Sequence, residues 1–305
     1  NLLEEEGFPA QARALPGEMR AGDRQTLHIQ IRAEVEIPCG AHITVLLPQF
    51  WGGIAQERDC STFFLRHSPQ TYPGYLSSHV SAHCEGGGSI EGTVTCCGSV
   101  HTAIDLVVQR TPIPVGKTLD LEIGDPSGLG VLPIDFSGTY SFNVAIDPLG
   151  DGKYRPILPH PRVGVVSGSP QAYRVTAPLL GSEGNSVRAV LMDRNMNPVL
   201  EREPAVVEIR QGDGYRYAEA HHPVWGFRGR SNPWVLGAWS EGYRGFFGEI
   251  HAHSEMSDGI RTLDEAYAFS RDTLGLDFAA LSDHFESRLP SIVNPNGRRW
   301  ELSMQ

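Results

Sequence analysis

Several features that would mark other classes of protein are missing from this sequence. No apolar run approaches the roughly 20 residues that a helix needs to cross a bilayer, and no run of five or more basic residues occurs. The formal net charge of −11 also opposes binding to nucleic acid or to an anionic membrane, because both attract clustered Lys and Arg. We therefore expect neither partner.

The start of the chain, NLLEEEGFPAQ, has neither the basic nor the apolar region of a secretory signal. This favours a cytoplasmic location. Secretion or export to a periplasm stays open, because processing would remove a signal that precedes Asn1.

Cysteine is scarce and irregularly spaced. The odd number of cysteines, with no regular spacing, does not form a disulfide framework, and the adjacent pair cannot form a C-x-x-C metal knuckle. We expect free thiols that are buried or half-buried in a β-rich domain and a reducing environment. The residues are Cys39, Cys60, Cys84, Cys96 and Cys97.

Alternating apolar and polar residues begin at residue 26, in TLHIQIRAEVEI. Period-two alternation is typical of a strand with one buried face. The apolar face of this run contains Leu27, Ile29, Ile31, Val35 and Ile37. Similar runs cover residues 42–48, 118–125 and 140–147, with Gly- and Pro-containing turns between them. The pattern predicts an antiparallel β-sandwich over residues 1–165.

A second β-rich block follows the turn-rich residues 166–173. It contains RVTAPL, SVRAVLMD and PAVVEIR at strand spacing, and SNPWVLG (231–237) is its predicted last strand. This layout predicts an immunoglobulin-like domain over residues 166–240.

Three features of these blocks have structural interpretations that we prefer to functional ones. The glycine-rich residues 124–130 lack the Lys-Ser/Thr ending of a phosphate loop, so we expect a turn. DPLGDGKY (147–154) lacks the spaced acids of a calcium loop and predicts a hairpin turn. His221 and His222 are adjacent, so we expect a loop pair without metal.

The pattern changes at residue 246. FFGEIHAH reads as a strand, and TLDEAYAFSRDTLG as a helix with a capping box formed by Thr262 and Glu265 and a stop at Gly275. LDFAALSDH is a second, apolar strand. Strand, helix and strand at this spacing predict a βαβ unit with parallel strands.

Polar residues gather where these two strands end. His251 and His253 are two residues apart, so in an extended strand their imidazoles project to one side and can reach one ion. The following turn can fold Asp258 back over the strand end, and His284 follows the next parallel strand at the same edge. A single histidine of this kind is usually a surface or core residue, but the combination predicts a metal site with His251, His253, Asp258 and His284 as ligands.

HAHSEMSDG followed by LDFAALSDH resembles the first two motifs of the PHP (polymerase and histidinol phosphatase) superfamily. Residues 246–284, preceded by β-rich domains, are most similar to its carbaryl-hydrolase-like branch. The resemblance implies a distorted (β/α) barrel with two or three divalent ions. His251 and His253 would then bind one ion, and Asp258 and His284 a neighbouring one. Asp283 would act in catalysis by fixing a histidine tautomer.

The family's later motifs supply a bridging Glu, further histidines and a closing Asp-x-His. No histidine follows His284 here, and Glu286 and Glu301 are the candidate acids that remain. One βαβ unit also cannot close a barrel. We therefore expect the chain to be an N-terminal portion, with the rest of the catalytic domain C-terminal to it or in another chain.

The predicted fold is mainly β, with two N-terminal β-sandwich domains followed, over residues 241–305, by the start of a PHP-type barrel. The resemblance implies a metal-dependent hydrolase that uses metal-activated water on an ester, carbamate or phosphoester bond. Imidazole and carboxylate ligands suit Zn, Mn or Fe. The substrate would be a small molecule or linked to a glycan, and a homo-oligomer stays open.

Two alternatives remain at this stage. The chain could be a non-catalytic β-sandwich binding or assembly module that carries an incomplete metal motif. It could also belong to a lyase for acidic polysaccharides, because a metal ion can acidify a proton beside a carboxylate.

Overall fold

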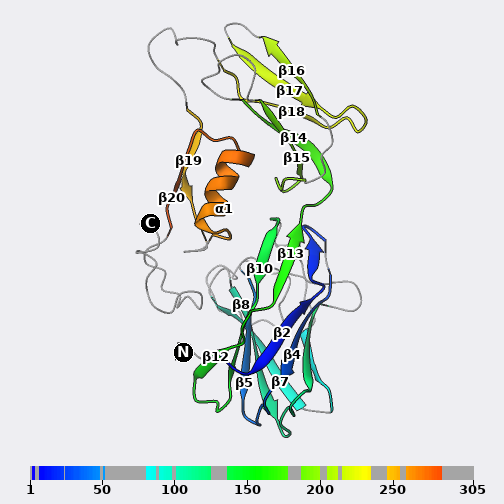
Figure 1. Cartoon of the computed structure of the whole chain (residues 1–305), viewed down its shortest axis with the longest axis vertical. Coiled ribbons are helices and arrows are strands. Elements are labelled where there is room, and N and C mark those ends of the chain that lie inside the picture. The colour runs from blue at the N-terminus through cyan, green and yellow to red at the C-terminus, as the bar shows by residue number, and fades with distance from the viewer. Residues whose placement is uncertain are drawn as a thin grey trace. The chain divides into compact units, whose positions relative to one another are not determined.

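The structure is a computed structural model, and it is mainly β, with a short helix near residue 265 (Figure 1). The described residues form two compact units, one within residues 1–166 and the other within 167–287. No helix in the described part of the chain is long and apolar enough to cross a membrane. The described ranges are 2–3, 7–23, 25–48, 51, 80–86, 89–97, 101–124, 136–177, 187–199, 205–211, 215–234, 246–254 and 259–283.

The first unit consists largely of two antiparallel sheets. The order of the six-stranded sheet is β1 (Leu2–Leu3), β12 (Lys153–Pro156), β11 (Asn143–Asp147), β5 (His42–Leu46), β8 (His101–Gln109), β7 (Ser89–Cys97), with β1 joined in parallel. The order of the four-stranded sheet is β2 (Ala10–Leu15), β4 (Leu27–Ala33), β9 (Thr118–Ile123), β6 (Val80–Cys84). A three-stranded sheet contains β10 (Gly138–Ser141), β13 (Arg162–Val166) and β3 (Glu18–Arg20).

The alternation that the sequence predicts is confirmed along β4. Leu27, Ile29 and Ile31 are fully buried, and the residues between them are at least partly exposed. Val35 was predicted on the same buried face, and this is wrong: its exposed fraction is 39%. The strand ends at Ala33, so the period of two no longer fixes which way later side chains point.

Cys39 and Cys84 differ in burial. Cys84 is buried as expected, but Cys39 is exposed, which corrects the prediction for that residue. Cys39 lies in the turn before β5, where the chain reverses at Gly40 with a φ of 83°. Cys60 and the side chains of Cys96 and Cys97 lie outside the described part of the structure.

Asp147 shapes the hairpin between β11 and β12, as the sequence predicts for residues 147–154. Its carboxylate accepts hydrogen bonds from the backbone N–H groups of Leu149, Gly150, Asp151 and Gly152 at 2.6–3.3 Å. Burial by itself raises the pKa of Asp147, but the four donors together outweigh burial and lower the pKa below its ordinary value. The carboxylate of Asp147 therefore stabilises the turn.

Acid should destabilise this hairpin. Because the pKa of Asp147 is lower in the folded state than its ordinary 3.8, its contribution is present above that pH and is lost as pH falls through the folded value. Asp147→Asn should reduce stability at neutral pH by about 1–3 kcal/mol and weaken the loss of stability below pH 4. Urea unfolding of wild type and variant between pH 2 and pH 7 measures both effects. Equal dependence on pH in the two proteins would contradict this assignment.

The second unit begins with two antiparallel sheets. Tyr173, Val175, Leu191, Ala218 and Trp234 are among the buried residues of its core. Trp234, in the predicted last strand, is paired with Arg216 as an isolated bridge. The pairings join β14 (Pro170–Thr176) to β15 (Arg188–Asp193), and β17 (Arg216–His221) to both β16 (Val206–Gln211) and β18 (Arg228–Arg230).

His221 and His222 do not form a loop pair, which corrects that prediction. His221 is the last residue of β17, and His222 is buried directly after it. The Nδ1 atom of His222 accepts hydrogen bonds from the N–H groups of Val224 and Trp225, and its ring stacks on Trp225 with centroids 4.4 Å apart. His222 therefore stabilises the turn to β18.

The predicted βαβ unit is present in the second unit. Strands β19 (Gly248–Ala252) and β20 (Phe278–Leu281) are parallel, with helix α1 (Leu263–Ala268) between them in the chain (Figure 1). The capping box is confirmed, because the side chains of Thr262 and Glu265 each accept the other's backbone N–H. The helix continues as a π-helical turn, η1 (Phe269–Thr273), and Gly275 ends it with a φ of 64°.

The β-rich class and its antiparallel sheets are thus established. The division into residues 1–165, 166–240 and 241–305, and the interpretation of the βαβ unit as the beginning of a barrel, stay predictions.

Candidate metal centre

The carboxyl ends of β19 and β20 meet at one edge of their sheet. The N–H of Ser282, just after β20, donates to the carbonyl of Ala252 at 2.7 Å. His253 follows Ala252 and Asp283 follows Ser282, so both lie at this edge. The parallel pairing that the sequence predicts is what brings residues 30 positions apart together.

His251 and His253 approach each other as ligands of one ion would. Their ring centroids are 5.2 Å apart, with planes inclined at 52°. Two imidazoles bound tetrahedrally to zinc through nitrogens at about 2.0–2.1 Å place their ring centres about 5 Å apart. His251 is exposed and His253 is half-buried, which leaves room for an ion at the surface. The histidine pair therefore fits a divalent metal.

Asp283 holds the backbone beside these histidines. One carboxylate oxygen accepts from the N–H of Ser254 and the other from its hydroxyl, both at 2.7 Å. Ser254 is fully buried, so this carboxylate supplies acceptors where water has no access. The predicted role of Asp283, fixing a histidine tautomer, stays a prediction; the contacts described fix Ser254, the residue after His253.

Gly259 closes the turn that follows the histidines. Its N–H donates to the carbonyl of Ser254 at 2.9 Å. A Cβ at this position would overlap the carbonyl group of His253 and lie 2.7 Å from the carbonyl carbon of Ser254. Only glycine fits this approach without movement of the backbone. The chain therefore returns to the end of β19 at Gly259, the residue after Asp258.

Two of the predicted ligands, Asp258 and His284, lie outside the described residues, so their ligation stays a prediction. Within the described ranges no three His, Cys, Asp or Glu residues gather closely enough to hold a metal ion. The candidate acids Glu286 and Glu301 also lie outside the described residues.

A β-bulge in β19 was not predicted. The register pairs Glu249 with Ala279 and Ala252 with Leu281. Two residues of β19, Ile250 and His251, therefore lie opposite the single residue between those partners. The sequence carries no local signal for this bulge, because it becomes visible only when the partner strand is in place.

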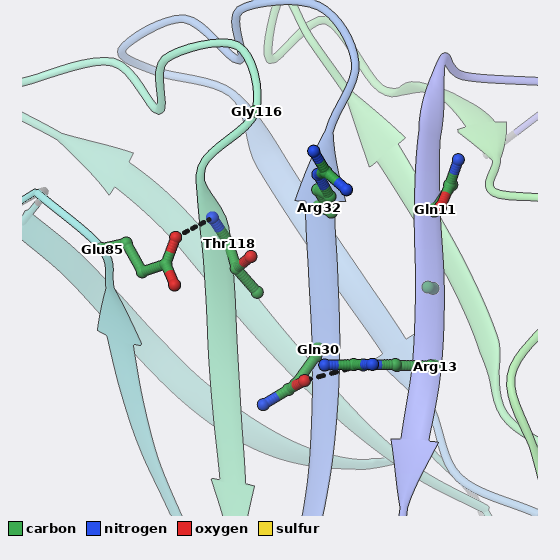
Figure 2. Close-up of a pocket in the computed structure, with 8 residues that line it drawn as sticks. Gln11, Arg13, Gln30, Arg32, Glu85, Gly116 and Thr118 are labelled. Atoms are coloured by element: carbon green, nitrogen blue, oxygen red, sulfur yellow. Dashed lines mark hydrogen bonds between the residues drawn. The ribbon is translucent and has the colours of Figure 1, made fainter.

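The first unit carries a separate polar groove with a volume of about 410 Å³. It lies over neighbouring strands of the four-stranded sheet, and Arg13 and Gln30 point toward each other across β2 and β4 (Figure 2). Arg13 Nε donates to Gln30 Oε1 at 2.8 Å, and Glu85 accepts from the N–H of Thr118. The sequence could suggest this surface only through the polar residues that alternate with the core of β4.

Comparison of the chain with models of protein families and with the sequences of curated proteins gives no match.

Proposed function

We propose that the βαβ unit carries part of a divalent metal centre of a metal-dependent hydrolase, which acts with metal-activated water on an ester, carbamate or phosphoester bond. The observation that carries the proposal is the approach of His251 and His253 to 5.2 Å at the carboxyl edge of a parallel strand pair. Catalytic sites of α/β barrels are built at this edge.

Each residue of the proposed metal centre has its own role. His251 and His253 bind one ion, and Asp258 and His284 bind a neighbouring one. Asp283 holds Ser254 and thereby the strand end at His253. A bound divalent ion supplies hydroxide near neutral pH, because it lowers the pKa of a coordinated water to about 7. Zn, Mn and Fe all suit imidazole and carboxylate ligands.

The apolar surface of the βαβ unit supports a larger catalytic domain. Ile250 is 70% exposed and Phe246 55% exposed, and Phe247, Tyr267 and Phe278 are also exposed. In a barrel, neighbouring strands and helices cover such side chains. We propose that further strands, supplied by a C-terminal continuation of the chain or by another chain, complete the domain.

The alternative from a different class is a non-catalytic binding module, and the groove of the first unit favours it. Arg13 and Arg32 both line the groove, and guanidinium groups bind carboxylates in fixed geometry. A ligand with anionic groups, such as an acidic polysaccharide, matches this chemistry. The same ligand class would suit a metal-dependent lyase.

Metal titration separates the two proposals. The folded wild-type chain should bind Zn²⁺ or Mn²⁺, measured by calorimetry and by metal content after dialysis. His251→Ala with His253→Ala should weaken binding by more than about 100-fold, because loss of a direct ligand exceeds the 10–100-fold effect of an outer contact.

His83→Ala is the matched control, because His83 is an exposed strand histidine in the other unit. It should leave metal binding unchanged. A folded wild-type chain that binds neither ion would contradict the hydrolase and favour the binding module.

A further inference from the structure

We propose that Glu249 is a positioning residue for the metal ligand His251, and that it acts by holding the backbone of the β19 bulge through its carboxylate. The inference rests on the proposed metal centre and extends it to a residue that does not itself bind the ion.

The hydrogen bonds of Glu249 are concentrated on the bulge. Its Oε1 atom accepts from the N–H of Ile250 at 2.9 Å and from the N–H of His251 at 2.8 Å. Residues in a bulge are displaced from the regular ladder of the sheet, so their N–H groups need other acceptors. A single carboxylate oxygen supplies one for both.

The bulge also decides the face on which the histidines lie. Side chains alternate along a strand, and one extra residue exchanges the faces for everything that follows. Glu249 and Ala252 pair with Ala279 and Leu281, which are two apart, so Glu249 and Ala252 share a face. His253, next to Ala252, then lies on the opposite face. Without the bulge, Glu249 and His253 would share a face.

This arrangement argues against Glu249 as a direct ligand. Its strand position belongs to the face opposite His253, and its Oε1 is already engaged by two backbone donors. The second donor is the backbone nitrogen bonded to the Cα atom of His251, so the carboxylate restrains the backbone from which that imidazole projects. Contacts of this kind orient metal ligands and typically change affinity 10–100-fold.

The test is Zn²⁺ affinity of the full chain, measured by calorimetry, with Co²⁺ absorption as a spectroscopic readout of the ligand set. Glu249→Ala should weaken Zn²⁺ binding by about 10–100-fold and reduce the Co²⁺ ligand-field intensity, as one imidazole leaves. Glu249→Gln should restore most of the affinity, because its amide oxygen can accept the same two hydrogen bonds.

Asp264→Ala is the matched control, since it removes one negative charge from an exposed residue of the same βαβ unit. It should leave the affinity unchanged. If Glu249→Ala does not fold, Glu249→Asp serves instead, because its shorter side chain keeps the charge but cannot reach both N–H groups.

Glu249→Gln that binds as weakly as Glu249→Ala would overturn the inference in favour of a charge or ligand role. Unchanged binding by Glu249→Ala, with binding lost in the double histidine variant, would overturn the inference alone. Binding retained in the double histidine variant would overturn the proposed function and this inference with it.

Discussion

Gly259→Ala is expected to destabilise the βαβ unit by about 3 kcal/mol or more, at the upper end of what overpacking costs. The added methyl group would meet the backbone of His253 and Ser254, which cannot rotate away as a flexible side chain can. Either the turn opens or the strand end moves. Both outcomes displace His253, so Zn²⁺ affinity should fall together with stability.

Hydrogen–deuterium exchange of peptides from residues 246–283 measures this effect within the unit, alongside Zn²⁺ titration. Gly17→Ala is the matched control: Gly17 has no heavy atom within 4 Å of its added Cβ. That variant should exchange like wild type. Unchanged protection of residues 246–254 in Gly259→Ala would contradict the close packing of Gly259 against the backbone of His253 and Ser254.

Asp283→Ala is the second change expected to have a large effect. It removes the two carboxylate oxygens that accept from the N–H and the hydroxyl of Ser254, a residue that water does not reach. A buried donor left unsatisfied costs about 1–3 kcal/mol, so the two donors together should cost about 2–6 kcal/mol. Asp283→Asn keeps one acceptor oxygen and should lose less.

A double-mutant cycle with Ser254→Ala isolates the contact between the two side chains. Ser254→Ala removes the hydroxyl but keeps the backbone N–H, so Asp283→Ala should cost less in its presence than in wild type. Exchange protection at the ends of β19 and β20 is the measurement. Strictly additive effects would show that the hydroxyl of Ser254 and Asp283 do not stabilise each other.

Local features of both units could be predicted, because interactions between residues close in the sequence determine them. The capping box of Thr262 and Glu265 needs three residues of spacing and nothing else, and Gly275 ends the helix because glycine adopts a positive φ readily. The alternation in β4 predicted its buried residues for the same reason, up to the residue where the strand ends.

Features that depend on a partner segment could not be predicted from the sequence. His222 follows a strand that the pattern did not reveal, and its role depends on the return of the chain at Trp225. The assignment of Asp283 to Ser254 required two strand ends to be in register.

The sequence by itself determined the β-rich class, the strand–helix–strand order and the chemical types at the candidate metal centre, because periodicity and spacing are local. Tertiary structure decided how those groups are held. Parallel pairing brought Asp283 to Ser254, close backbone approach made Gly259 necessary, and a one-residue bulge at Ile250 and His251 set the face of His253. Register is a relation between two strands, so neither strand encodes it alone.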